Sequence, residues 1–489
     1  MQALTEQRDS AAHAFAQGIA HGDAGRHDQA LACFAEAVGR DPDHAAARFN
    51  LALVLSHLGR KAEAADMLRA ILEHIPDQPD ALFALAGVLN DLERYPAALT
   101  HLTRLKAVAP RHPGLDEAFG LALLRGEAPG EAEAPLRRAI ARTPANAATL
   151  NNLGAAFMAQ RRPADAERLY RRAATTDEAT PAYRKNLGVS ELLQGNLVAG
   201  FRHYEARREQ TVWRWNRAFP GKGEWRGEAV AGRTILVYFE QGLGDSVQFA
   251  RYFGVLKAMG ARTIFLCQPE LASLLASVPG IDHLVVDGDP LPPFDCHIPL
   301  MSLPDRLGTT VATIPGGIPY IRAAPDIAQW WAGRMPADGL RVGLHWQSHG
   351  PERCIPHDAL APLAGIAGVR LYSLQPETGA ERVLPPRFGI ITREEIAPGR
   401  TGFADTAGMI ANLDLMVCCD SSVAHVAGAM GMPVLLILPW LGDWRWMLDP
   451  HATPWYPRTR LFRSPAPGDW DTPIRAAAAW VAAAALSAR

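Results

Sequence analysis

The sequence has no excess of charge of either sign. Its 489 residues include 49 lysines and arginines and 51 aspartates and glutamates, so the formal net charge is −2 at pH 7. A chain without a general basic field lacks the electrostatic attraction on which non-specific binding to nucleic acids and anionic membranes depends. We therefore expect no nucleic acid among its partners.

Paired cysteines and long apolar runs are also missing. None of the six cysteines stands in a Cys-x-x-Cys pair, so we expect buried free thiols. The most apolar tracts, such as residues 433–441, are broken by proline and too short to cross a bilayer. The first residues lack the basic start and apolar run of a signal peptide. These absences predict a cytoplasmic protein without a membrane span.

A 34-residue period dominates the first 200 residues. Small residues at this interval let two antiparallel helices approach closely, bulky residues fill the gap behind them, and proline ends the second helix. The prolines are Pro42, Pro76, Pro110 and Pro144; the small residues are Gly18, Ala52, Ala86, Gly120, Gly154 and Gly188; the bulky residues are Phe34, Leu68, Leu102, Leu136, Tyr170 and Tyr204.

This pattern resembles the tetratricopeptide repeat, with about six units in residues 11–209. Such units form arrays because each buries its apolar faces against its neighbours. The resemblance implies a curved superhelix whose groove binds a peptide or protein partner. Asn50, Asn152 and Asn186 share one repeat position, from which their amides could pair with a peptide backbone. The alternative is that they are ordinary solvated asparagines.

The rest of the chain has a different pattern. After a Gly- and Trp-rich connector at residues 210–233, short apolar runs alternate with helical patterns, which predicts βαβ units and parallel sheets. A break in this alternation indicates two lobes, residues 234–330 and 340–489. Chemistry is expected at the carboxyl ends of the strands. The expected strands are residues 234–239, 263–267, 283–286, 341–346, 369–374, 413–419 and 434–438.

The first of these strands leads into EQGLGDSVQFARY, residues 240–252. Gly242 and Gly244 permit a tight turn and close backbone approach ahead of a helix. The run lacks the third glycine of a dinucleotide fingerprint, so a nicotinamide enzyme is not expected. Asp245, where the turn becomes the helix, has two interpretations: a catalytic base or a helix-capping residue.

A second site is predicted in MVCCDSSVAHVAGAMGMP, residues 416–433, where a buried strand meets a helix. Asp420 follows the strand, and Ser421 and Ser422 open the helix. Free N–H groups at a helix start, together with two hydroxyls, form a cradle for a diphosphate. His425 could add a further donor. A Ser-His-Asp hydrolase is not expected, because three such residues within six positions rarely reach triad geometry.

The second half of the chain, from residue 234 to about residue 470, resembles the heptosyltransferase-type glycosyltransferases, which have the two-lobed GT-B fold. More narrowly, it resembles bacterial proteins that fuse such a domain to tetratricopeptide repeats. The fold class expected is therefore an α-solenoid followed by two Rossmann-like α/β lobes. The segments that carry the resemblance are residues 242–252, 289–310, 342–348, 373–375, 403–434, 443–449 and 453–463.

The resemblance implies roles for individual residues. Asp245 is the candidate base on the acceptor side, and residues 420–425 grip the donor's diphosphate. Arg353 is the candidate contact for the leaving phosphate, with a surface ion pair as the alternative; the loop before it is shorter than in relatives. No metal and no cofactor besides the nucleotide sugar, a co-substrate, are implied. Other expected cleft residues are Trp346, Gln375, Asp405 and Trp444, with Trp446 and Trp455 in the core.

A peptide-binding array joined to a sugar-transfer domain predicts a protein O-glycosyltransferase. The array would bind the acceptor and raise its concentration at the cleft; flagellin is one acceptor considered for such proteins. Two alternatives remain open. The acceptor could be a lipid or a polysaccharide, or the chain could be a binding scaffold whose glycosyltransferase half is degenerate.

Overall fold

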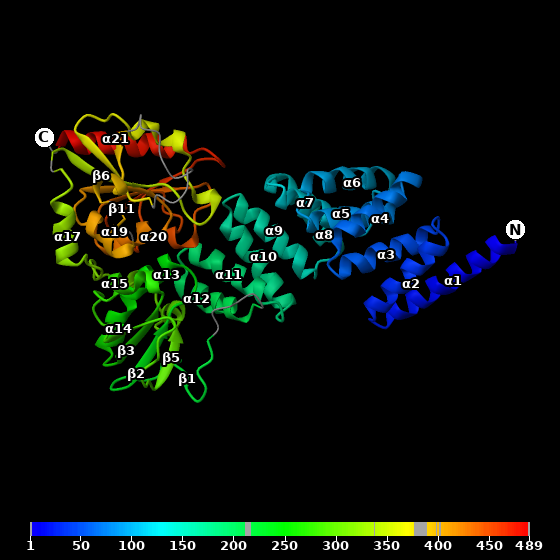
Figure 1. Ribbon diagram of the computed structural model, residues 1–489, viewed down its shortest axis with the longest axis horizontal. Coiled ribbons are helices and arrows are strands. Elements are labelled where there is room, and N and C mark those ends of the chain that lie inside the picture. The colour runs from blue at the N-terminus through cyan, green and yellow to red at the C-terminus, as the bar shows by residue number, and fades with distance from the viewer. Residues whose placement is uncertain are drawn as a thin grey trace. The chain divides into compact units, whose positions relative to one another are not determined.

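The computed structural model describes residues 2–210, 217–336, 338–375, 389–397, 399–400 and 402–487. The chain divides into two compact units, Met1–Tyr183 and Arg184–Arg489 (Figure 1). The expected fold class is confirmed: a helical repeat array precedes an α/β region with parallel sheets. In the described part of the chain, no helix is long and apolar enough to cross a membrane.

The first unit is built from antiparallel helix pairs. The predicted prolines follow the second helix of a pair, and in three of these four places a side chain caps the start of the next helix. Gln78 Oε1 accepts the Ala81 N–H at 3.1 Å, and Asn146 Oδ1 accepts the Thr149 N–H at 3.0 Å. The helices are α1 (Gln2–Asp23), α2 (His27–Arg40), α3 (Ala45–His57), α4 (Lys61–His74), α5 (Pro79–Asp91), α6 (Tyr95–Val108), α7 (Leu115–Arg125), α8 (Pro129–Arg142), α9 (Ala147–Ala159) and α10 (Pro163–Thr176).

The small and bulky registers meet as the sequence predicts. A Cβ atom added to Gly120 would lie 2.5 Å from the Leu136 side chain, and one added to Gly154 would lie 2.7 Å from the Tyr170 ring. Both distances are shorter than real Cβ contacts, so the helices approach this closely only because the residue is glycine. The 34-residue period therefore determines the packing within each pair.

The last helix pair belongs with the second unit. It consists of α11 (Pro181–Leu193) and α12 (Leu197–Tyr204), followed by the 3₁₀ segment η1 (Glu205–Glu209). Leu192, Leu197 and Phe201 lie in the same hydrophobic core as the two parallel sheets. The predicted repeat region, residues 11–209, thus crosses the division between the units.

The first sheet is parallel and has the strand order β1-β5-β2-β3-β4. Its first strand comes from the predicted connector, where Trp225 is fully buried and donates its indole N–H to the Glu228 carbonyl at 2.8 Å. Trp213 and Trp215 of the connector lie outside the described residues. The strands are β1 (Gly223–Glu224), β2 (Thr234–Tyr238), β3 (Arg262–Cys267), β4 (His283–Val286) and β5 (Cys296–Pro299).

The second sheet, also parallel, has the order β11-β10-β9-β6-β7-β8. The helix α19 (Phe403–Ile410) packs against α17 (Pro325–Ala332), and α21 (Asp471–Ser487) packs against β10 and β11. All seven predicted strands are present, but β1, β5, β8 and β11 were not predicted. The strands are β6 (Leu340–His345), β7 (Val369–Ser373), β8 (Ile390–Ile391), β9 (Leu415–Cys419), β10 (Val434–Leu438) and β11 (Thr459–Arg463).

The two lobes meet through the helices that follow β2 and β9. These are α13 (Leu243–Phe249) and α20 (Ser422–Ala429), which pack directly against each other. A Cβ atom added to Gly244 would lie 2.9 Å from His425 Cδ2. Arg251 also crosses between the lobes, since its Nη1 donates to the Trp455 carbonyl at 2.9 Å. The two motifs identified from the sequence therefore face each other.

Candidate functional site

A cavity of about 750 Å³ lies where the carboxyl ends of β2, β6, β7, β9 and β10 lead into loops. Both lobes contribute to it, as expected for parallel sheets that bind ligands beyond the ends of their strands. Its lining residues are Gln241, Gly242, Leu243, Gly244, Asp245, His345, Gln347, Ser348, His349, Arg353, Gln375, Asp420, Ser421, Ser422, His425, Asp443 and Arg445.

Most of the predicted site residues line this one cavity, although 163 residues lie between the two motifs, residues 240–252 and 416–433. The sequence also missed several lining residues, above all His345, Asp443 and Arg445. The predicted residues that the structure brings together are Gly242, Gly244, Asp245, Arg353, Gln375, Asp420, Ser421, Ser422 and His425.

Trp346 is a correction. It is 1% exposed and packs in the core of the second lobe, whereas its neighbours His345 and Gln347 line the cavity. Successive side chains of an extended segment point to opposite sides, so the residue between two cavity residues is buried. The prediction was wrong by one position.

Two other expected cleft residues also lie elsewhere. The Asp405 carboxylate accepts the Trp331 indole N–H at 3.1 Å, where α19 meets α17. Trp444 packs edge-on against Phe201 of α12, with ring centroids 5.7 Å apart. Trp446 and Trp455 are buried, in agreement with the expected core positions.

The three asparagines of the predicted peptide groove lie on repeat helices. Asn50 is half-buried and its Nδ2 donates to the Ala46 carbonyl of its own helix at 2.9 Å. Asn152 is also half-buried in the first unit, whereas Asn186 lies on α11 and belongs to the second. Their role toward a peptide stays a prediction.

Asp245 stands in the first turn of α13 and uses both carboxylate oxygens. Its Oδ2 accepts the Gly242 N–H at 2.8 Å, which caps the helix start. Its Oδ1 forms an ion pair with Arg445 from the other lobe. The capping interpretation is therefore realised in the structure, and the same carboxylate faces the cavity.

Arg445 lies between two carboxylates. Asp443 Oδ1 accepts hydrogen bonds from the Arg445 backbone N–H at 3.0 Å and from Arg445 Nη1 at 2.8 Å. The other terminal nitrogen, Arg445 Nη2, donates to Asp245. Burial favours the neutral form of Asp443, but the Arg445 charge and these hydrogen bonds more than offset it, so the Asp443 pKa lies below its usual value. The sequence signals were an Asp-x-Arg pattern in the loop after β10 and its place in residues 443–449, one of the segments that carry the family resemblance.

The pKa of Asp420 is shifted in the opposite direction from that of Asp443. Asp420 is 4% exposed, and its Oδ2 lies 3.8 Å from Arg353 Nη1. Burial, and then the negative charge of Asp443, raise the Asp420 pKa from 3.8 to about 6, although Arg353 and Arg445 act against this shift. A carboxyl group that becomes half protonated only about one pH unit below neutrality therefore faces the cavity.

We expect the Asp420→Asn variant to be more stable than the wild type near neutral pH. Because the Asp420 pKa is raised, the folded state binds this proton more tightly than the unfolded state does. Protonation of Asp420 therefore stabilises the fold fully below about pH 4, and this stabilisation is lost as the pH rises through about 6. The loss corresponds to up to about 3 kcal/mol. Denaturant unfolding, followed by fluorescence of the 12 tryptophans, all of which lie after residue 210, measures it.

The matched control lies in the same cavity. Because the pKa of Asp443 is lowered, Asp443→Asn should destabilise the protein near neutral pH and have a smaller effect under acid conditions. If both amide variants shift the unfolding midpoint in the same direction, the opposite environments described for the two carboxyl groups are wrong.

His425 contributes hydrogen bonding rather than charge. It is buried, stacks on Trp446 with centroids 5.2 Å apart, and its Nδ1 lies 3.0 Å from the Tyr456 hydroxyl. Burial and the nearby Arg445 charge lower its pKa to about 3. The ring is neutral at physiological pH, so any hydrogen bond that His425 donates comes from a neutral imidazole.

Two polar contacts fix the loops around the motif. The Ser421 hydroxyl lies 3.2 Å from His345 Nδ1, which ties the start of α20 to the end of β6. Gln375 Oε1 accepts the Gln347 N–H at 3.1 Å and so holds the loop after β6. Among the described residues, no group of three or more His, Cys, Asp or Glu side chains is arranged to hold a metal ion.

Chemically, the cavity combines groups that suit a phosphorylated sugar. The N-terminus of α20 and the two arginines can stabilise negative charge, and Asp245 is a carboxylate within the same space. A volume of this size is typical of sites for ligands as large as a nucleotide.

Comparisons with known proteins agree with these two halves. Residues 364–437 match glycosyltransferase family 9 (heptosyltransferase), and residues 15–79 and 146–176 match tetratricopeptide repeats. Protein FlbA of Caulobacter vibrioides is 24% identical over 310 residues, which cover 57% of this chain and 51% of that protein. The chain thus spans about half the length of this curated relative.

Solved structures of helical repeat proteins resemble part of the chain at low scores. MamA from Desulfovibrio magneticus RS-1 has a TM-score of 0.32 and 22% identity, covering 35% of this chain and 98% of that one. PilF of Pseudomonas aeruginosa has a TM-score of 0.37 and 16% identity, covering 42% and 93%.

The family 9 match covers β9, α20 and β10 up to its penultimate residue, including the whole Asp420-to-His425 motif, and it supports glycosyltransferase activity. The chain therefore contains tetratricopeptide repeats followed by a region that matches the heptosyltransferase-type glycosyltransferases of family 9.

Proposed function

We propose that the protein is a nucleotide-sugar-dependent, metal-independent glycosyltransferase that acts on a protein acceptor recruited by its repeats. The observation that carries this proposal is the convergence of the family 9 segment with Arg353, Arg445 and Asp245 on a single cavity. No separate cofactor is needed in this scheme, since the nucleotide sugar is the co-substrate.

The proposed reaction is a single transfer. Asp245 accepts the proton of the acceptor hydroxyl while the hydroxyl oxygen forms the new bond to the sugar's anomeric carbon. The bond from that carbon to the phosphate breaks, and the nucleoside diphosphate leaves with the electron pair. The α20 N-terminus, Arg353 and the neutral donor His425 stabilise the departing charge.

Asp420 has a part in donor binding. A fully ionised carboxylate at the base of a diphosphate cradle would repel the ligand, whereas a carboxyl group with a pKa of about 6 takes up a proton at little cost. We therefore place the donor's diphosphate beside Asp420, Ser421 and Ser422 rather than beside Asp443, which keeps its charge.

The acceptor is proposed to be a protein because the other half of the chain is a tetratricopeptide array. An array that holds the acceptor converts a bimolecular encounter into an effectively intramolecular one, with a gain in effective concentration. Flagellin is the first acceptor to test. A lipid or polysaccharide acceptor, with the repeats recruiting a partner protein, would appear instead as transfer to a non-protein product.

The proposal is tested by a thermal-shift screen of the full chain against common nucleotides and nucleotide sugars. We expect one nucleotide to raise the unfolding temperature, and the double variant Asp420→Ala with His425→Ala to lose that shift. Transfer from the corresponding sugar to candidate acceptors is then followed by mass spectrometry. Arg475→Met, an exposed ion-pair residue of α21, is the control that should retain the shift.

The competing hypothesis, a scaffold with an inactive domain, predicts other outcomes. In cells, Asp245→Asn should abolish glycosylation if the chain is an enzyme and leave it unchanged if the chain only recruits another one. Absence of any ligand-dependent shift across the screen, together with unchanged glycosylation in the Asp245→Asn strain, would reject the proposed activity.

A further inference from the structure

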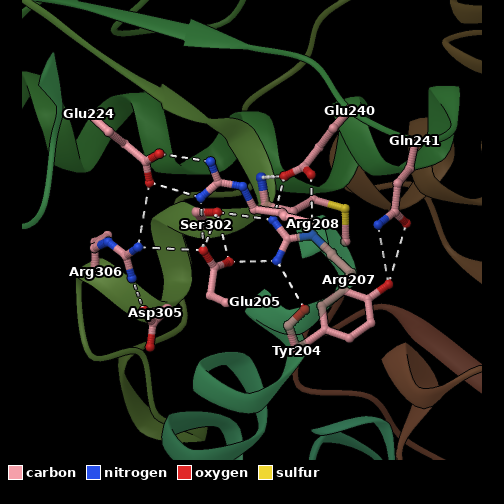
Figure 2. A network of polar contacts seen from close by, with 11 residues as sticks. Tyr204, Glu205, Arg207, Arg208, Glu224, Glu240, Gln241, Ser302, Asp305 and Arg306 are labelled. Carbon is pink, nitrogen blue, oxygen red and sulfur yellow. Dashed lines mark hydrogen bonds and ion pairs between the residues drawn. The ribbon is translucent and has the colours of Figure 1, made fainter. Parts of the chain in front are cut away.

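The last repeat contacts the loop that follows β2 and lines part of the cavity. Figure 2 shows Tyr204, the last residue of α12, and three residues of η1 in a polar network with Glu240 and Gln241, which follow β2. We infer that Tyr204 is a positioning residue for Gln241, so that the last tetratricopeptide repeat forms part of the framework of the glycosyltransferase site. The effect on transfer rests on the proposed function, whereas the positioning itself does not.

Gln241 needs to be held in place. It lines the cavity and has a φ of +62°, in the left-handed region that residues other than glycine seldom adopt. Such a conformation is strained and persists only where the surroundings fix it. Gln241 also directly precedes Gly242, whose backbone N–H donates to Asp245.

The repeat fixes the residue just before Gln241. Arg207 Nη2 donates to Glu240 Oε1 at 2.7 Å, and its Nε donates to Oε2 at 3.2 Å. Glu240 Oε1 also accepts the Met301 N–H at 2.9 Å. Arg207 is 2% exposed and Glu240 is 1% exposed, so this two-pronged contact is closed to water and geometrically strict.

The repeat also holds the Gln241 side chain. The Tyr204 hydroxyl lies 3.3 Å from Gln241 Nε2 and 3.5 Å from Oε1. Burial raises the pKa of Tyr204, so the hydroxyl keeps its proton and can donate. The Tyr204 ring packs against Trp444, with centroids 5.8 Å apart, and Trp444 directly precedes Arg445. Tyr204 therefore contacts Gln241, which lines the cavity in the first lobe, and Trp444, the neighbour of the cavity residue Arg445 in the second lobe.

The position of Tyr204 in the repeat shows what is special about it. Tyr170, 34 residues earlier, fills the same register of the preceding repeat, where its ring packs on Gly154. The Tyr170 ring serves helix packing, whereas the Tyr204 ring packs on Trp444. The hydroxyl of Tyr204 has the additional contact with a cavity residue, so removing only that hydroxyl separates positioning from packing.

The test is hydrogen exchange on the full-length Tyr204→Phe variant without any ligand. The amides of residues 241–245 should exchange roughly five- to tenfold faster than in the wild type, since the loss of one hydrogen bond is felt as a more frequent local opening. Amides of β9 and β10 should be unchanged. Tyr170→Phe, the matched control, should leave the exchange of residues 241–245 at the wild-type rate.

A double variant decides whether Tyr204 acts through Gln241. Gln241→Ala alone should accelerate the same amides, and adding Tyr204→Phe should have no further effect. Wild-type exchange in Tyr204→Phe, or independent additive effects in the double variant, overturns the inference. With a donor identified, Tyr204→Phe should raise KM several-fold with a smaller change in kcat; a chain without transferase activity would fail only this last measurement.

Discussion

Replacing Arg207 with methionine is expected to destabilise the second unit by about 3–5 kcal/mol, because it removes one partner of a buried ion pair. Arg207 lies on the 3₁₀ segment after the last repeat and pairs with Glu240 and Glu205 (Figure 2). Burial already raises the Glu240 pKa, and the Arg207 charge opposes that shift. Without the arginine, Glu240 is left as a buried carboxylate without its cation.

The experiment has an internal reporter and two comparisons. Because all the tryptophans lie in the second unit, their fluorescence during urea unfolding follows that unit and not the first. The double variant Arg207→Met with Glu240→Met should recover most of the loss, since apolar residues can replace a buried pair. Arg184→Met, which breaks the exposed pair with Glu209, should cost less than about 1 kcal/mol. Equal effects of Arg184→Met and Arg207→Met would contradict the prediction.

Much of the architecture could be predicted because it is repetitive or apolar. The 34-residue period predicted the helix pairs, and Gly154 and Tyr170 meet because close helix packing needs a small residue opposite a large one. The strand β5, by contrast, was missed. Its sequence CHIP has four residues with a histidine and a proline, and it shows neither alternation nor an apolar run, yet it pairs with β2 in the sheet.

The site divides along a similar line. Asp420 and Ser421 could be predicted because a strand-to-helix junction has a local sequence pattern. Arg445 could not, because its partner Asp245 is 200 residues away and the contact exists only once both lobes have folded. The opposite pKa shifts of Asp420 and Asp443 likewise depend on burial and neighbours rather than on residue type. Pairing and protonation required the structure.

Replacing Arg445 with methionine is expected to lower the rate of sugar transfer by about 10²- to 10³-fold. The cavity lining holds Asp245, Asp420 and Asp443 against Arg353 and Arg445. Removal of Arg445 leaves Asp245 and Asp443 without their shared cation, so the site repels an anionic donor and the proposed base loses its fixed orientation. Both consequences act on the transferase step, which is measured as initial rate with the donor identified in the screen.

A charge-balanced variant separates electrostatics from packing. Arg445→Met combined with Asp443→Asn removes one charge of each sign. Nucleotide affinity should therefore recover by tenfold or more relative to Arg445→Met alone. The transfer rate should stay low, because Asp245 still lacks its ion pair with Arg445. The guanidinium carbon of Arg445 lies 4.3 Å from the centroid of the Trp444 ring, and both variants lose this cation–π contact equally, so the comparison between them isolates the charge. If Arg445→Met transfers sugar as fast as the Arg475→Met control, Arg445 has no part in the site. If the double variant binds nucleotide no better than Arg445→Met, its role is structural and the charge argument fails.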